Sequence, residues 1–172
     1  GAMAYGLWTG PGDRRLELDR VNFSRPQLIR DVMVRNGDAH KPIWAAEVGW
    51  NALPEGWPDP PTHGQVSLEL QAAYARAAYE RAIREWPWMG VLFYWHFGLP
   101  YDENRDQQMF YFRMADPDLT KMPVYDAVKS VATAPGVVGI GRHYGDHWAI
   151  ETSGAARKLT GATEMPAGSA AS

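Results

Sequence analysis

The chain has 172 residues, which is enough for one domain with a core of its own. A net charge of -3 gives no basic surface, so binding to nucleic acid or to an anionic membrane is not expected. No apolar run approaches the roughly 20 residues of a membrane span, and the absence of cysteine excludes disulfides and thiolate metal sites.

The N-terminal segment starts with Gly1-Ala2-Met3, a tripeptide typical of the scar left when a tag is cleaved, so residues 1–3 are set apart. The glycine-rich stretch 5–23 is predicted to be a loop. A helix is expected next, with Ser24 as its N-cap and Pro26 in its first turn, and Asn36-Gly37 ends it.

The most informative stretch is the apolar run 42–48, which has the length and content of a buried strand. It contains one carboxylate, Glu47, with Gly49 and Trp50 close behind. A buried carboxylate is costly unless it is paired or functional. The alternative is that Glu47 is the first exposed residue after the strand, and residue types alone leave both interpretations open.

Helices and strands then alternate. The expected elements are a proline-rich loop at 53–64, a helix at 67–85, a strand at 89–95, a loop at 98–108, a short extended piece at 110–112 and a helix at 123–132. In the long helix, the apolar stripe is assigned to Leu70, Ala73, Tyr74, Ala77 and Ala78, with the stem of Arg81 as a further candidate. Long loops after strands and short ones after helices are the rhythm of α/β units.

The C-terminal part changes character after residue 135. Residues 137–140 and 147–150 are predicted to be short strands of a following β module within 135–152, and the small polar tail 153–172 is predicted to be disordered. His143 and His147 are four residues apart, but Gly145 lies between them and no third ligand is nearby. No metal and no other cofactor is therefore predicted.

Residues 4–134 resemble the C-terminal part of clan A retaining glycoside hydrolases, such as families 39 and 5. The resemblance rests on the strand 43–48 with Glu47, Gly49 and Trp50, and on the strand 92–95, which ends in Trp95. A third match is Ala4-Tyr5-Gly6, which is similar to the rim of strand six. The resemblance as a whole implies an α/β fold that is a partial (β/α)8 barrel, about strands six to eight with their helices.

The resemblance also implies site residues. Glu47 matches the catalytic nucleophile and Trp95 the tryptophan that floors a sugar subsite, while Trp50, His96 and Tyr5 are the further candidates for substrate binding. Each has a structural alternative, because tryptophans more often fill cores and His96 is equally well explained as a satisfied core histidine.

One departure from the family pattern limits this interpretation. A retaining mechanism needs a second carboxyl group, which in the family is a Glu after an Asn, and the chain contains no Asn-Glu pair. We therefore expect a fragment that carries the nucleophile but is inactive alone and binds oligo- or polysaccharide. Its open strand edges would be covered by a homo-oligomer or by a complementing N-terminal barrel part.

Two other functions stay open from the sequence. One is a non-catalytic carbohydrate-binding or scaffold piece, and the other is an α/β fragment in which Glu47 is structural. The localisation is undetermined, with a secreted parent protein as one option.

Overall fold

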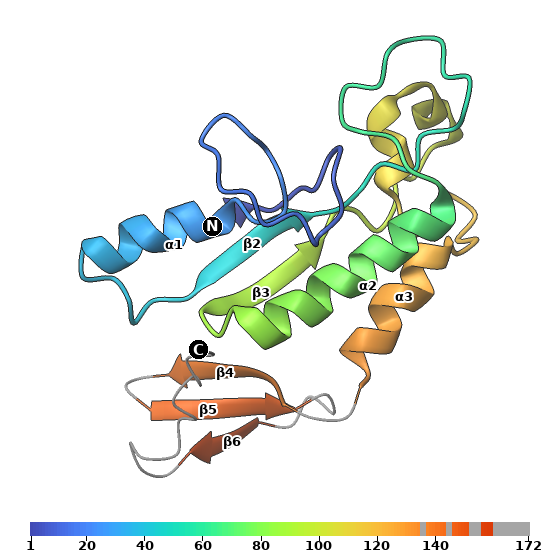
Figure 1. The fold of residues 1–172 in the computed structure, drawn as a ribbon. Helices are drawn as coiled ribbons and strands as arrows, with labels where there is room; N and C mark the ends of the chain where they lie inside the picture. The colour runs from blue at the N-terminus through green and yellow to red at the C-terminus, as the bar shows by residue number, and fades with distance from the viewer. Residues whose placement is uncertain (135–136, 144–145, 152–155, 160–172) are drawn as a thin grey trace. The chain divides into compact units, whose positions relative to one another are not determined.

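The computed structural model describes residues 1–134, 137–143, 146–151 and 156–159. The chain divides into two units, Gly1–Val131 and Ala132–Ser172. The first is an α/β unit and the second is built from strands (Figure 1).

The first unit is organised around a parallel sheet in the order β1-β2-β3 (Figure 1). Its strands are β1 (Ala2–Met3), β2 (Ile43–Val48) and β3 (Met89–Tyr94). All three run in the same direction, so their C-terminal ends share one edge. Ala2 and Met3, set apart in the sequence as a cleavage scar, thus form the outer strand of this sheet.

The first two helices connect the strands as expected for βα units, and the third follows β3. They are α1 (Pro26–Arg35), α2 (Leu68–Glu85) and α3 (Pro123–Ala132). Ser67 caps α2, its hydroxyl accepting a hydrogen bond from the Leu70 backbone N–H at 3.1 Å. Among the described residues, no helix is long and apolar enough to cross a membrane.

The core lies between the sheet and α2. Ala45 and Val48 of β2 pack with Ala78 and Ala82 of α2, and their small side chains allow the helix to approach closely. The aromatic members of this core are Phe23, Trp50 and Trp86. The predicted helix face was partly right: Ala78 and Arg81 are buried and Tyr74 packs against the core. Leu70 and Ala73 are exposed, however, and Gln71, Ala75 and Ala82 are buried in their place.

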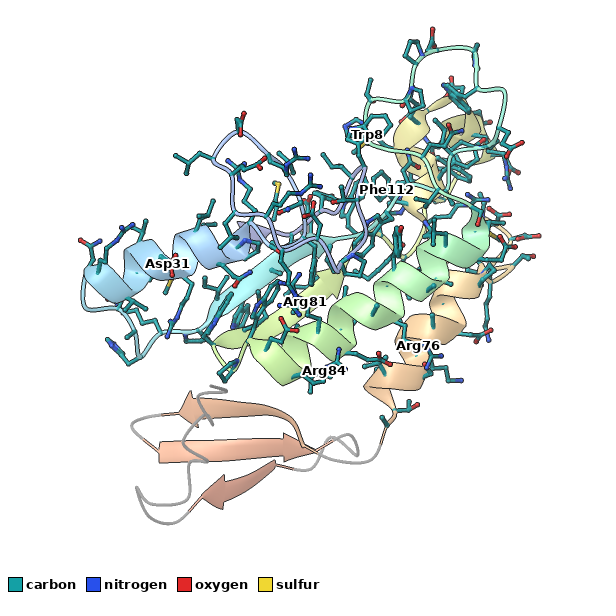
Figure 2. The ribbon with its side chains drawn as sticks, in the orientation of Figure 1. Trp8, Asp31, Arg76, Arg81, Arg84 and Phe112 are labelled. Atoms are coloured by element: carbon teal, nitrogen blue, oxygen red, sulfur yellow. The ribbon has the colours of Figure 1, made fainter. Side chains whose placement is uncertain are left out.

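The start of α1 also differs from the prediction. Arg25 occupies the N-cap position without a side-chain hydrogen bond. Ser24 is buried and donates to the Asp13 carbonyl, while it accepts from the Arg81 guanidinium at 2.8 Å. Arg81, labelled in Figure 2, also bonds the Pro11 carbonyl and Glu85, so it ties the 11–24 loop to α2. Ser24 is used for this tie and not for a helix cap.

The second unit is a three-stranded antiparallel sheet, in the order β4-β5-β6. The strands are β4 (Val137–His143), β5 (Asp146–Glu151) and β6 (Ala156–Leu159). The first two confirm the predicted strands and extend them. The predicted disordered tail is wrong at β6, and the rest of that tail, 160–172, lies outside the described residues.

The long loop after β3 contains two 3₁₀ helices, Asp102–Asp106 and Gln108–Phe112. The second replaces the extended piece predicted at 110–112. It buries Phe110 and Phe112 and returns the chain to the C-terminal edge of the sheet, where the Ala52 backbone N–H donates to the Tyr111 carbonyl.

Candidate functional site

Glu47 lies near the C-terminal end of the middle strand. The register of β2 against β3 is irregular between Ala45 and Val48, so Val48 and not Glu47 continues the buried side of the strand. Glu47 is left half-buried at the edge of the sheet. This position combines access from outside with a fixed backbone.

Tyr5 holds the Glu47 carboxylate. The backbone N–H of Ala4 donates to the Glu47 carbonyl at 2.8 Å, which aligns the end of β1 with that of β2. The Tyr5 hydroxyl then donates to Glu47 Oε2 at 2.5 Å. Burial, together with this hydrogen bond, raises the pKa of Tyr5, so the phenol stays a donor to the carboxylate. The structure thus brings these two predicted site residues together.

Trp95 approaches from the third strand. Its backbone N–H donates to the Val48 carbonyl at 2.9 Å, directly after Glu47. Its half-buried ring lies edge-on to Tyr5, at 6.1 Å between ring centroids, and to Phe112, at 5.3 Å. Phe112, which Figure 2 labels, also contacts Tyr5, with ring centroids 5.6 Å apart. Three aromatic rings therefore form one cluster at the end of β2, and one of them, Tyr5, is bonded to Glu47.

Gly49 makes this closeness possible. A Cβ at residue 49 would lie 2.8 Å from the Trp95 carbonyl oxygen and 3.1 Å from the Phe112 ring. Any side chain would push Trp95 away from the end of β2. The glycine two residues after Glu47 is explained by this packing.

His96 extends the same cluster. Its peptide bond with Trp95 is cis, and its ring centroid lies 4.6 Å from that of Trp95. Nε2 is 3.2 Å from the Met109 carbonyl, which can only accept, so Nε2 carries the proton. Burial lowers the pKa of His96, which favours the neutral ring. His96 is positioned by the loop, and no contact joins it to Glu47.

Trp50 is not part of an open site, which corrects its prediction as a substrate-binding residue. It is fully buried, with Phe23 and Tyr74 against its ring, and its indole N–H donates to the Thr9 carbonyl at 2.8 Å. Without a free face it cannot stack on a sugar. The sequence could not distinguish this role, because a tryptophan after a strand end suits both.

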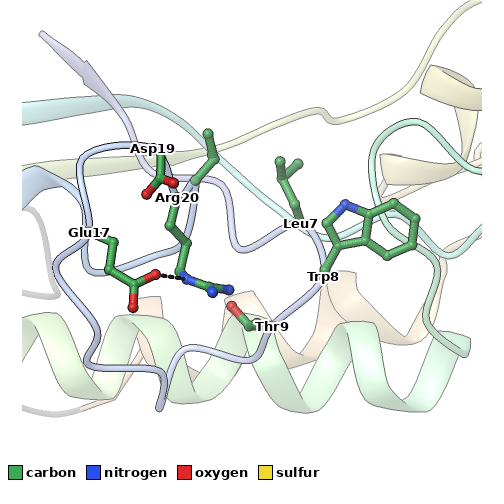
Figure 3. Close-up of a pocket in the computed structure, with 7 residues that line it drawn as sticks. Leu7, Trp8, Thr9, Glu17, Asp19 and Arg20 are labelled. Carbon is green, nitrogen blue, oxygen red and sulfur yellow. Dashed lines mark hydrogen bonds and ion pairs between the residues drawn. The ribbon is translucent and has the colours of Figure 1, made fainter.

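Two hollows occur near this edge of the sheet, and Glu47 lines neither. One, of about 580 Å³, lies between the loop after β2 and the start of α2, from Ala52 to Leu70, with Tyr111 and Arg113 beside it. The other, of about 380 Å³, lies in the loop after β1 (Figure 3). Among the described residues, no group of three or more His, Cys, Asp and Glu side chains is arranged to hold a metal ion.

Sequence comparisons give no further assignment: no protein-family model matches the chain, and no match was found among curated proteins. A search of solved structures found a family 39 glycoside hydrolase from the gut symbiont Bacteroides cellulosilyticus WH2, with a TM-score of 0.57 and 17% identity. The match covers 86% of this chain and 30% of that one. At this identity the likeness shows the fold: the chain is similar to under a third of a family 39 enzyme and carries a partial barrel-like sheet.

Proposed function

We propose that this chain carries the nucleophile half of a retaining glycoside hydrolase site, with Glu47 as the nucleophile. The observation that supports this most is the Glu47 carboxylate at the C-terminal end of a parallel strand, fixed by the Tyr5 hydroxyl at 2.5 Å. Catalytic groups of α/β barrels lie at these strand ends. The likeness of the fold to a family 39 glycoside hydrolase points to the same chemistry.

Each residue has a defined part in the proposed mechanism. A carboxylate oxygen of Glu47 attacks the anomeric carbon, and the bond from that carbon to the leaving oxygen breaks. Tyr5 keeps the carboxylate oriented. Trp95 offers an apolar ring beside the sugar, and Phe112 supports both aromatic side chains from behind.

The second carboxyl group of the proposed mechanism comes from outside this chain. The acid/base must lie about 5–5.5 Å from the nucleophile. The group that bonds the Glu47 carboxylate is the Tyr5 phenol and not a carboxyl group, and no Glu in the sequence follows an Asn. We therefore expect the chain alone to hydrolyse ordinary glycosides very slowly, and to act with a partner that covers its open strands.

This proposal can be tested on the chain as it stands, because a very good leaving group removes the need for the general acid. Incubation with 2,4-dinitrophenyl 2-deoxy-2-fluoroglycosides of gluco, galacto and xylo configuration should release close to one equivalent of dinitrophenolate. Peptide mass spectrometry should then place the sugar on Glu47. Each adduct would survive because no base activates water against it.

The matched control is Glu103→Gln, on an exposed loop, which should label like the wild type. Glu47→Gln keeps the shape of the side chain and should not label. Absence of any adduct from all three sugars, or labelling that persists in Glu47→Gln, would refute the nucleophile. Sugar binding without labelling would favour a non-catalytic carbohydrate-binding piece.

A further inference from the structure

Trp8 is the most conspicuous side chain that the proposed site does not use. It is 63% exposed, and no hydrogen bond or ring contact joins it to another described residue. Single exposed apolar residues are common on proteins and need no explanation by themselves. What distinguishes Trp8 is the way its backbone is held and what lies next to it.

The turn that carries Trp8 is fixed on three sides. The Thr9 backbone N–H donates to the Gly6 carbonyl at 3.1 Å, and the buried indole of Trp50 donates to the Thr9 carbonyl. Leu7 has a φ of 49°, a left-handed conformation that is uncommon for a side chain of its type. Gly64 packs against the Leu7 backbone so tightly that a Cβ there would lie 2.2 Å from its carbonyl oxygen. Strain of this kind persists only where the surroundings impose it.

The hollow beside this turn combines an apolar wall with polar groups. Its lining comprises Leu7, Trp8, Thr9, Glu17, Asp19, Arg20 and Val21. Figure 3 shows the Trp8 ring on one side and the polar side chains from the second arm of the loop on the other. Its volume of about 380 Å³ lies in the lower part of the range of small-ligand pockets, roughly 300–1,000 Å³.

The polar arm of the hollow is held in place as well. Arg25 donates to the backbone carbonyls of Leu18 and Arg20, at 3.0 and 2.8 Å. Glu17 pairs with Arg20 at 2.6 Å. Asp19 makes no hydrogen bond or ion pair with any described residue, which leaves its carboxylate available to a ligand. The backbone of both walls is thus held in place, which lowers the cost of binding.

We propose that this hollow is a subsite for a neutral pyranose ring, with Trp8 stacking on the apolar face of the sugar and Asp19 and Arg20 bonding its hydroxyls. The choice of a sugar rests on the proposed function. The charge argues for a neutral ring, because two carboxylates face one guanidinium and an anionic sugar would be repelled. Since neither Glu47 nor Tyr5 lines the hollow, it would hold a sugar unit other than the one at Glu47.

The test uses the ¹⁵N-labelled chain and the indole N–H signals of its tryptophans, with Trp8→Phe identifying the Trp8 signal. Methyl β-D-glucopyranoside and methyl β-D-xylopyranoside are titrated separately, and methyl β-D-glucuronide tests the charge. The Trp8 signal and the amides of Thr9 and Arg20 should shift with a neutral sugar, and the signal of buried Trp50 should not. Trp8→Ala should weaken binding, followed at those amides, about tenfold.

Two controls separate this subsite from the proposed catalytic function. Trp57→Ala, which removes a tryptophan outside the hollow, should leave the titration unchanged. Asp19→Asn removes one carboxylate from the hollow and should therefore reduce the difference in affinity between the neutral sugars and the glucuronide. Shifts that survive in Glu47→Gln would support the hollow even if labelling of Glu47 failed. No shift at Trp8 with either neutral sugar, or equal binding of the glucuronide, would overturn the subsite while leaving the nucleophile untouched.

Discussion

The two faces of the β1-β2-β3 sheet differ sharply. On the side of α2, Ala45 and Val48 are almost completely excluded from solvent, beneath the helix. On the opposite side, Met3, Trp44 and Phe93 are 62%, 54% and 49% exposed, and the rings of Trp44 and Phe93 contact each other. Parallel sheets normally have both faces covered. One face of this sheet is therefore packed beneath a helix, and the other is open and aromatic.

The largest effect is expected on the covered side. Phe23 has no exposed surface and stacks on Trp86 with a centroid distance of 4.9 Å. Phe23→Ala should lower the free energy of unfolding by about 3–5 kcal/mol, because it leaves a cavity among aromatic rings. Urea unfolding followed by circular dichroism measures this. The matched change on the open face, Phe93→Ala, should cost much less, and equal losses would contradict the contrast between the faces.

The loop after β2 allows a second comparison, between two of its glycines. Gly56 and Gly64 have φ values of +75° and +79°, but only Gly64 also packs against the Leu7 backbone. Gly56→Ala should cost about 1 kcal/mol from backbone conformation alone. Gly64→Ala should cost at least twice as much, because the added Cβ meets a carbonyl oxygen. If both variants unfold at the same urea concentration, the loop contact contributes nothing to stability.

How far the sequence could predict the fold depends on which contacts are local. The alternation of helices and strands from α1 to α3, with the strands at Ile43–Val48 and Met89–Tyr94, follows from apolar runs and turn residues and was predicted correctly. The strand at Ala2–Met3 was not predicted. The buried face of α2 was predicted only in part, because Ala73 and Ala78 are equally apolar and only the tertiary packing decides which of them faces the sheet.

The candidate site shows the same limit. Glu47 stands out in the sequence, but the Tyr5 hydroxyl on its carboxylate joins residues 42 positions apart and depends on strand register. Phe112 was missed because a 3₁₀ helix in a long loop returns it to the sheet edge. Trp8 was not among the predicted site residues, although its position inside a glycine-rich loop could have singled it out, because a tryptophan in such a loop seldom packs in a core.

The open face leads to a prediction about association. Exposed aromatic side chains beside unpaired strand edges favour contact with another polypeptide, and a second copy is the first candidate to test. Sedimentation velocity should show an average mass that rises with concentration. The double variant Trp44→Glu with Phe93→Glu should associate at least about tenfold more weakly, because it places charges in an apolar contact.

The control for association is Ile83→Glu, which changes an even more exposed apolar residue on α2 and should leave the average mass unchanged. A wild-type chain that remains monomeric at every concentration would exclude self-association. The open face would then require a different polypeptide, such as a complementing part of a barrel.

The smallest expected effect concerns pH at His96, where burial lowers the pKa of the ring. In the unfolded chain the imidazole takes up a proton near pH 6.5, whereas in the folded chain it does so only at lower pH. The unfolded state therefore binds more protons as the pH falls from about 7 toward 5, and stability decreases over this range. His96→Gln should remove that part of the pH dependence. The other titratable groups are the same in the wild type and the variant, so the difference between the urea midpoints of the two proteins isolates the contribution of His96. A midpoint difference that stays constant from pH 7 to pH 5 would show that protonation of His96 is not coupled to folding.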